Sequence, residues 1–301
     1  MVKNLRPRDL PQEEFILPGT RACSGCGLSL CYRYALKALG KNTIITVPAS
    51  CSTVLHGMYP CAAVKLPMLN TAFESTGASA SGIRAALNAL GRKGITVLAW
   101  AGDGGTTDIG IQALSGAAER RTDIIYACYD NEAYMNTGTQ RSGSTPFGAF
   151  TTTTTTGKKE RRKNMPMIMA AHGIPYVATT NSAYPIDVYK KFKRAKEEFS
   201  GDTRYIHIFS PCPPGWGFDT RDLIKIGKLA TETGVWDLYE IINGKFQLNG
   251  DTLKIAQGKK KRKPVIEYFR SQKRFNTLKD EDIKRIQEEI DKKYDEYAKL
   301  V

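Results

Sequence analysis

The chain has 301 residues, with 44 lysine and arginine residues against 30 acidic ones, so its formal net charge is +14. Its composition, 41% hydrophobic and 25% charged, is ordinary for a folded globular protein and excludes wholesale disorder. It contains no apolar run of the roughly 18–20 residues that a membrane-spanning helix needs, and its first residues lack the apolar stretch of a secretory signal. We therefore expect a cytoplasmic protein that makes no membrane contact.

β-Branched runs alternate with Ala/Leu-rich stretches over the first 210 residues. The expected strands are 43–47, 94–100, 124–129, 175–178 and 205–209, and the expected helices are 28–39, 78–90, 109–120, 165–171 and 186–199. Several strands are nearly continuous apolar runs, which is typical of a parallel sheet covered on both faces. The pattern predicts an α/β domain over residues 1–255, built on a doubly wound, mostly parallel sheet. The Thr151–Thr156 run has no hydrophobic spacing, and we interpret it as a flexible loop.

Residues 256–301 have a different character, a basic linker followed by one amphipathic stretch. Large apolar side chains recur there at spacings of 3, 4, 4 and 3, at Ile283, Ile286, Ile290, Tyr294 and Tyr297. This predicts a C-terminal helix within 277–300 that Thr277 is placed to cap. Such a helix could fold back on the domain or lie on a partner subunit.

The positive charge is concentrated in two segments. Residues 158–163 have a net charge of +4 and residues 259–274 a net charge of +7, which together make +11 of the total. Two interpretations remain open, a dock for nucleic acid or an acidic protein, and solvated loops. The chain contains no recognisable nucleic-acid-binding module, so we expect no nucleic-acid partner.

Polar and sulfur-containing side chains follow four of the expected strands. Ser50-Cys51 follows the first, Gly102-Asp103-Gly104-Gly105 the second, Asp130-Asn131 the third, and Ser210-Pro-Cys212 the last. Because ligands of doubly wound sheets bind beyond the carboxyl ends of the strands, we expect these groups at one edge.

The carboxylate and amide in this set match a thiamine diphosphate signature. Gly102-Asp103-Gly104 is followed, after 26 residues, by Asn131. Mg²⁺ prefers oxygen ligands, and it would hold the diphosphate through Asp103, the Asn131 side chain and the backbone carbonyl of Ala133. The glycines would let the backbone approach the phosphates, and a helix beginning near Thr107 would direct its positive end toward them.

The thiols form a second candidate site. Cys23-Ser-Gly-Cys26 is a CxxC motif, and Cys51 and Cys212 each follow a strand. Four thiolates suit either tetrahedral Zn²⁺ or a [4Fe–4S] cluster, and the neighbouring thiamine signature favours the cluster. Cys61 is the rival to Cys212 as fourth ligand. Cys31 and Cys128 are expected to be buried, and the three histidines (His56, His172, His207) to be structural.

These motifs together resemble the β subunits of the 2-oxoacid:ferredoxin oxidoreductases, most closely those of pyruvate:ferredoxin oxidoreductase (pyruvate synthase). The matching stretches are Arg21–Gly27, Gly102–Gly105, Tyr129–Gly138 with Gln140, Thr145–Gly148 and Ser210–Trp216. The resemblance implies the thiamine diphosphate-binding fold and coenzyme A-dependent oxidative decarboxylation of pyruvate to acetyl-CoA and CO₂, in either direction.

The resemblance also assigns roles to residues. The [4Fe–4S] ligands would be Cys23, Cys26, Cys51 and Cys212, and the Mg²⁺ ligands Asp103, Asn131 and Ala133. Asn136 would lie beside the reacting carbon of the cofactor, and Gly27 and Thr137 would contact the cofactor, together with Gly102, Gly104 and Gly105.

Partners follow from the parts that the chain lacks. In the family, an α subunit supplies the glutamate that activates thiamine and the groups that bind substrate. Further subunits carry ferredoxin-type clusters and the coenzyme A site, and ferredoxin accepts the electrons; the assembly is expected to be a dimer of heteromers. Because ferredoxin is typically acidic, the basic segments could serve as its dock.

Three alternatives remain open from sequence. The first is the same family acting on oxalate or on branched-chain or aromatic 2-oxoacids. The second is a thiamine enzyme without redox chemistry, which would hold no iron. The third is a zinc-stabilised nucleic-acid-binding protein, which would leave the Gly102–Gly104 and Asn131 motif without a purpose.

Overall fold

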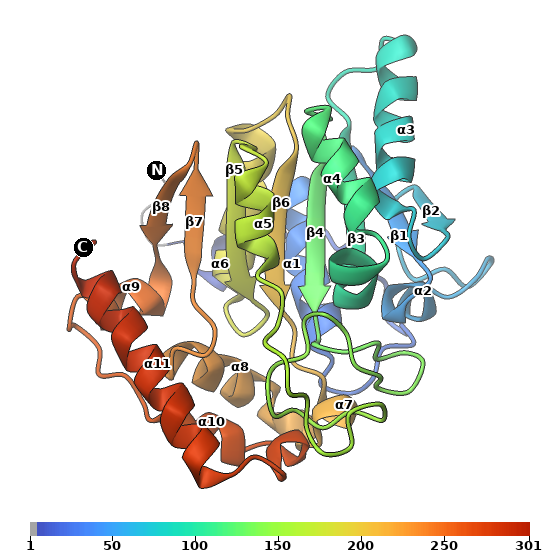
Figure 1. Ribbon diagram of the computed structural model, residues 1–301. Coiled ribbons are helices and arrows are strands. Elements are labelled where there is room, and N and C mark those ends of the chain that lie inside the picture. Colours follow the sequence, from blue (N-terminus) through green and yellow to red (C-terminus); the bar gives the residue numbers. More distant parts are fainter. Residues whose placement is uncertain (1–4) are drawn as a thin grey trace.

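The computed structural model describes residues 5–301, and it contains an eight-stranded sheet with helices on both faces (Figure 1). The strand order is β2-β1-β3-β4-β6-β5-β7-β8. The five predicted strands are confirmed as parallel neighbours: β1 (Thr43–Pro48), β3 (Thr96–Gly102), β4 (Ile125–Asp130), β5 (Tyr176–Asn181) and β6 (Arg204–Phe209). A short parallel strand that the sequence did not predict, β2 (Met68–Thr71), pairs with β1 at the edge.

Helices cover the two faces of the sheet as in a doubly wound fold. On one face lie α1 (Gly27–Leu39) and α6 (Pro185–Glu197), whose apolar side chains share a core with Trp100 and Ile206. On the other lie α3 (Thr76–Ala89), α4 (Ile111–Glu119) and α5 (Met165–Ala171), packed on Ala99 and Tyr126. Every residue of β4 is buried because both faces are covered, which explains why its sequence is apolar up to the final Asp130. The predicted fold class is confirmed.

An antiparallel hairpin that the sequence analysis missed extends the sheet beyond β5. It consists of β7 (Tyr239–Ile242) and β8 (Lys245–Leu248), and β7 pairs antiparallel with β5. The turn is Asn243-Gly244, and both residues have positive φ angles, 47° and 78°. Asn-Gly between two alternating apolar runs is a strong hairpin signal because both residues tolerate this backbone region.

The C-terminal segment builds a third core below the sheet rather than standing apart. Helices α8 (Leu223–Glu232), α9 (Gly250–Ala256), α10 (Val265–Arg270) and α11 (Asp280–Ala298) all contribute to this core, which also contains Phe209 and Trp216 (Figure 1). The predicted stripe of α11 faces inward, with Ile283, Ile290 and Tyr294 buried. The helix therefore folds back on its own chain.

The predicted cap of this last helix is wrong. Lys279, not Thr277, occupies the N-cap position, and no side-chain hydrogen bond caps the helix. The first turn instead contains Asp280, Glu281 and Asp282. Their negative charges stabilise the helix because its first backbone N–H groups carry partial positive charge.

Shorter elements surround the carboxyl edge of the sheet. They are the helices α2 (Cys51–His56) and α7 (Pro213–Trp216), the π-helical turn η2 (Gly104–Asp108), and 3₁₀ turns at Thr220–Asp222 and Lys273–Phe275. A further 3₁₀ turn spans Pro7–Asp9 near the start of the chain. The threonine run is a loop as predicted, but hydrogen bonds tie it down: Thr152 Oγ1 donates to the Gly138 carbonyl at 2.9 Å, and Thr151 is buried. Across residues 5–301, none of the helices is long and apolar enough to cross a membrane.

Candidate cofactor and metal site

A cavity of about 350 Å³ opens at the carboxyl ends of β1, β3 and β4. Its walls come from the start of α2, from Phe73, from the Gly102–Gly105 turn and from the loop that follows β4. The structure thus brings together three of the four strand ends that the sequence analysis singled out. Cys51, Asp103 and Asn131 all line this cavity.

Three polar groups converge on one side of the cavity. The end of the Asn131 side-chain amide lies 2.9 Å from the Ala133 carbonyl oxygen and 3.0 Å from Asp103 Oδ1, and either its oxygen or its nitrogen can occupy this position. Acceptors at these distances repel one another unless a cation lies among them or the amide turns to donate. Octahedral Mg²⁺, bound at about 2.0–2.1 Å, places neighbouring ligand oxygens about 3 Å apart. The three predicted Mg²⁺ ligands therefore fit the spacing that this ion requires.

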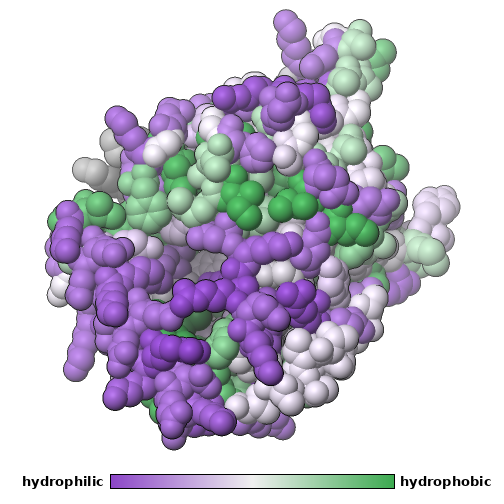
Figure 2. Space-filling model, viewed as in Figure 1, coloured by the Kyte–Doolittle hydropathy of each residue, from purple (hydrophilic) through white to green (hydrophobic). Residues whose placement is uncertain are grey.

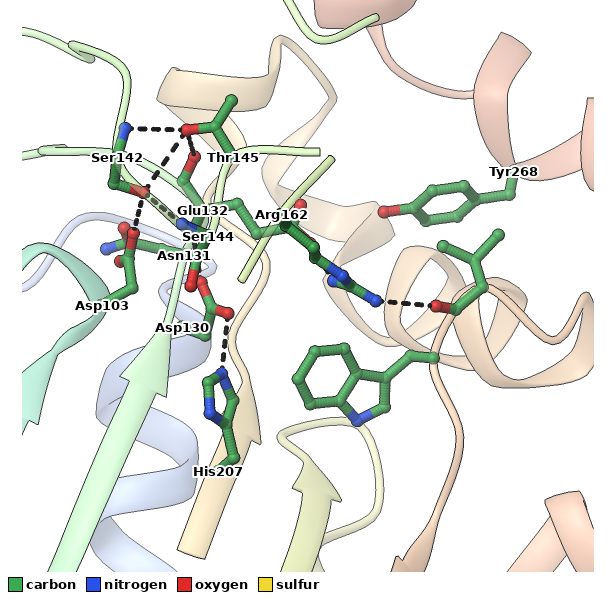
Figure 3. Close-up of polar contacts among 12 residues, drawn as sticks. Asp103, Asp130, Asn131, Glu132, Ser142, Ser144, Thr145, Arg162, His207 and Tyr268 are labelled. Carbon is green, nitrogen blue, oxygen red and sulfur yellow. Dashed lines mark hydrogen bonds and ion pairs between the residues drawn. The ribbon is translucent and has the colours of Figure 1, made fainter. Parts of the chain in front are cut away.

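Asp103 is held in a buried, oxygen-rich environment at this point (Figure 3). Burial raises its pKa well above the ordinary value, and the nearby Asp130 carboxylate raises it further. Ser142 Oγ donates a hydrogen bond to Asp103 Oδ2 and so fixes the carboxylate. A bound dication would offset the cost of burying this charge, which is a second way in which the residues fit Mg²⁺.

The glycine turn after β3 is shaped by its aromatic neighbour. A Cβ on Gly104 would lie 2.3 Å from a ring carbon of Tyr134, so only glycine allows this ring to pack there. The Tyr134 hydroxyl donates to Asp108 Oδ2 at 2.8 Å, and the Gly143 amide donates to the same oxygen at 2.8 Å. The predicted helix start near Thr107 is wrong. The π-helical turn η2 starts directly after Asp103, and α4 itself begins at Ile111.

The four predicted cluster cysteines lie in one neighbourhood. Cys23 is exposed, whereas Cys26, Cys51 and Cys212 are partly buried. Burial raises the pKa values of Cys51 and Cys212 to about 12. Cys26 and Cys23 raise both values further, Asp103 adds to the shift of Cys51, and Cys51 adds to the shift of Cys212. Cys26 is joined to the Cys212 segment through the Gly27 amide, which donates to the Pro211 carbonyl at 3.3 Å.

These thiols do not form a tight single-ion site. Within residues 5–301, no three His, Cys, Asp or Glu side chains are grouped closely enough to hold one metal ion. Tetrahedral zinc, with Zn–S bonds of about 2.3 Å, would need sulfur atoms about 3.8 Å apart. The remaining thiols are placed as predicted, with Cys31 and Cys128 buried and Cys61 exposed in a loop.

The other predicted site residues are divided between the cavity and its surroundings. Gly102, Gly104, Gly105, Asn136 and Thr137 line the cavity. Gly27 does not; it lies against Pro211, and a Cβ there would come within 2.8 Å of the Pro211 carbonyl oxygen. Gly27 thus allows α1 to approach the Cys212 segment.

Sequence reasoning missed several residues that shape the site. Phe73 and Met135 line the cavity, and Ser142 fixes Asp103. No spacing rule points to these residues, because their positions depend on loops that fold over the sheet edge. His207 is structural as expected: its Nε2 contacts Asp130 Oδ2 at 2.8 Å (Figure 3), and its Nδ1 contacts Tyr205 Oη at 2.7 Å.

The two basic segments are largely engaged within the chain. Eight of their thirteen basic residues form internal ion pairs with carboxylates. Lys158 is buried, and its ammonium donates to the Thr145 carbonyl at 2.7 Å. The face that includes α10 and α11 is strongly hydrophilic (Figure 2). Much of the positive charge is therefore compensated by carboxylates of the same chain, which weakens the interpretation of these segments as a binding surface for an acidic partner.

Comparisons with known proteins show which family this chain belongs to. The family model "Thiamine pyrophosphate enzyme, C-terminal TPP binding domain" matches residues 50–207, which include Cys51, Asp103 and Asn131. Pyruvate synthase subunit PorB of Methanothermobacter thermautotrophicus is 51% identical over 287 residues, covering 94% of this chain and 96% of the relative. Ketoisovalerate oxidoreductase subunit VorB of Pyrococcus furiosus is 46% identical over 309 residues, covering 99% and 97%.

A solved structure supports the same relationship. A chain of 2-oxoglutarate:ferredoxin oxidoreductase from Magnetococcus marinus, determined with 2-oxoglutarate, coenzyme A and succinyl-CoA bound, superimposes with a TM-score of 0.57. It is 26% identical, and the match covers 70% of this chain and 69% of that one.

Proposed function

Since this chain belongs to the β-subunit family of the 2-oxoacid:ferredoxin oxidoreductases, we propose that it is the thiamine diphosphate-binding subunit of a pyruvate:ferredoxin oxidoreductase. The observation that carries the proposal is the convergence of the Asp103 carboxylate, the Asn131 amide and the Ala133 carbonyl beside a cavity lined by Cys51. One wall offers a magnesium site for a diphosphate, and another offers a thiol for a redox centre. A non-redox thiamine enzyme has no use for the second.

The cofactor would be held through its diphosphate, with Asp103, Asn131 and the Ala133 carbonyl as ligands of Mg²⁺. Bound thiamine diphosphate would supply attack on a 2-oxo carbon and would accept the electron pair that the broken C–C bond leaves behind when CO₂ departs. The chain's own contribution is position: Ser142 orients Asp103, and Asp108 ties the loop after β4 to the turn after β3. Asn136 lies in the cavity wall, where it can contact the reacting end of the cofactor.

The redox centre would be a [4Fe–4S] cluster on Cys23, Cys26, Cys51 and Cys212. The pKa values of about 12 for Cys51 and Cys212 mean that these buried sites need a positive centre to bind as thiolates. A four-iron cluster is wider than one ion, so it suits thiols that are neighbours without forming a single-ion site.

This chain would act as one subunit of a larger enzyme. Among the described residues that line the cavity, Asp103 is the only acidic one, and it faces the magnesium ligands. The glutamate that activates thiamine and the groups that bind the substrate carboxylate would come from an α subunit. Further subunits would carry the coenzyme A site and the clusters that lead to ferredoxin.

Dye reduction by the natively purified complex under anaerobic conditions tests the proposed function. We expect coenzyme A-dependent reduction of a low-potential viologen with pyruvate as the preferred acid. Ketoisovalerate is the second candidate, because a VorB relative at 46% identity is nearly as similar as the PorB relative at 51%. A complex that contains iron and thiamine but reduces no dye with any 2-oxoacid would contradict the oxidoreductase assignment.

An exposed apolar loop beside the cavity is a candidate contact for the α subunit. Thr53 and Val54 of α2 line the cavity, and the segment that follows α2 exposes 82% of Met58 and 94% of Tyr59. In Figure 1 this segment extends away from the body of the molecule. Methionine and tyrosine are enriched in protein interfaces, where they bury much area at low entropic cost.

We expect Tyr59→Asp to weaken binding of the α subunit by at least about 30-fold, because this is the typical effect of removing one side chain that contributes strongly to an interface. Native mass spectrometry of the co-expressed complex would measure the fraction of assembled subunits. Leu90→Asp is the matched control, because Leu90 is 72% exposed at the end of α3, and its contacts do not involve the cavity. If both variants lost assembly equally, or if neither variant lost it, the loop would not be part of the interface.

A further inference from the structure

Glu132 lies between the two predicted magnesium ligands of the loop after β4, Asn131 and Ala133. Its backbone has a φ of 63°, a region that residues other than glycine rarely adopt. Its amide donates to Asp130 Oδ1 at 2.8 Å, and its carbonyl accepts from Thr145 Oγ1 at 2.6 Å. The position of Glu132 therefore sets the directions of the ligand groups on both sides of it.

The buried carboxylate of Glu132 pairs with two arginines from distant segments. Arg162 contacts Oε1 at 2.9 Å, and Arg274 contacts Oε2 at 2.7 Å. The side chains of Glu132 and Arg274 are only 1% and 2% exposed, whereas that of Arg162 is 31% exposed. Both side chains of the Arg274 pair are thus removed from water, so their charges attract each other with little screening, although Glu132 Oε2 accepts no well-aligned hydrogen bond.

Arg274 also reaches the same loop by a second route. Its guanidinium lies 3.5 Å from the ring centroid of Trp216, and the Trp216 indole donates to the Asn131 carbonyl at 2.8 Å. Hydrogen bonds with the Tyr268 hydroxyl and Gln272 Oε1 fix the guanidinium from the other side. One arginine of the C-terminal segment therefore contacts both Glu132 and the tryptophan that holds Asn131.

We propose that Arg274 is a positioning residue for the metal ligands. Through Glu132 and Trp216, it holds Asn131 and the Ala133 carbonyl where their oxygens converge with Asp103. The inference rests on the proposed magnesium and thiamine diphosphate site, and it gives part of the basic C-terminal segment a role in that site. Groups that orient metal ligands typically change metal affinity about 10–100-fold when removed.

The test is the Mg²⁺ concentration that half-saturates thiamine diphosphate binding to the purified complex, measured by equilibrium dialysis. We expect Arg274→Gln to need about 10–100-fold more Mg²⁺ than the wild type. Arg274→Lys should recover only part of the loss, because lysine lacks the planar group that stacks on Trp216. Arg270→Gln is the matched control: this arginine of the same segment forms an exposed pair with Asp280, and its loss should leave the Mg²⁺ requirement unchanged.

A double variant separates positioning from folding. Arg274→Gln alone leaves part of the Glu132 charge uncompensated in the interior, which could destabilise the fold. Glu132→Gln combined with Arg274→Gln removes both charges, so a folded complex should be recovered that still needs at least about tenfold more Mg²⁺. Wild-type Mg²⁺ dependence in the folded double variant, or in Arg274→Gln itself, would overturn the inference. Failure of the wild-type complex to bind the cofactor would instead overturn the proposed function.

Discussion

Replacing Asp103 with alanine is expected to abolish magnesium-dependent binding of thiamine diphosphate and, with it, turnover of 2-oxoacids. Asp103 supplies the only charged oxygen among the three that converge in the cavity, and its carboxylate is buried. Without it, the amide of Asn131 and the carbonyl of Ala133 are two neutral ligands for a doubly charged ion. A loss of at least about 4 kcal/mol in cofactor binding, or about 10³-fold, is the expected size for such a metal ligand.

The measurement is thiamine diphosphate binding to the purified complex across a range of Mg²⁺ concentrations, followed by dye reduction. Asp219→Ala is the control, because this exposed aspartate pairs only with the exposed Arg221. The α subunit should remain bound in both variants, which separates loss of the cofactor from loss of assembly. Retention of normal Mg²⁺ dependence by Asp103→Ala would show that the oxygen cluster is not the metal site.

The sequence predicts that the proposed magnesium ligands Asp103 and Asn131 lie together, because each directly follows one of two neighbouring strands. Asp103 and Asn131 follow β3 and β4, and these strands are adjacent and parallel, so their ends meet at one edge. The same reasoning places Cys51 in the cavity, because β1 is the neighbour of β3. Wherever a functional residue directly follows a buried parallel strand, the strand order alone brings it to the site.

The supporting contacts could not be predicted in this way. Arg274 lies 142 residues after Glu132, and in sequence it is one member of a basic run that resembles a solvated surface. A buried ion pair and an exposed one consist of the same residue types, so the sequence does not distinguish them. Only the packing of the third core shows that the Arg274 pair is buried. The Asn243-Gly244 hairpin is a different kind of miss, because its signal is present in the sequence.

Replacing Cys212 with serine is expected to remove the iron–sulfur cluster while leaving thiamine diphosphate bound. Cys212 is partly buried beside α7, and its charge is coupled to those of Cys23, Cys26 and Cys51. Serine is a poor substitute for a thiolate, so iron content should fall and dye reduction should drop at least about 100-fold. Cys61→Ser is the matched control, because Cys61 was the rival fourth ligand and lies exposed in a loop. If iron were lost from Cys61→Ser and retained in Cys212→Ser, Cys61 rather than Cys212 would be the fourth ligand. If Cys212→Ser lost thiamine diphosphate together with the iron, Cys212 would support the whole cavity rather than the cluster alone.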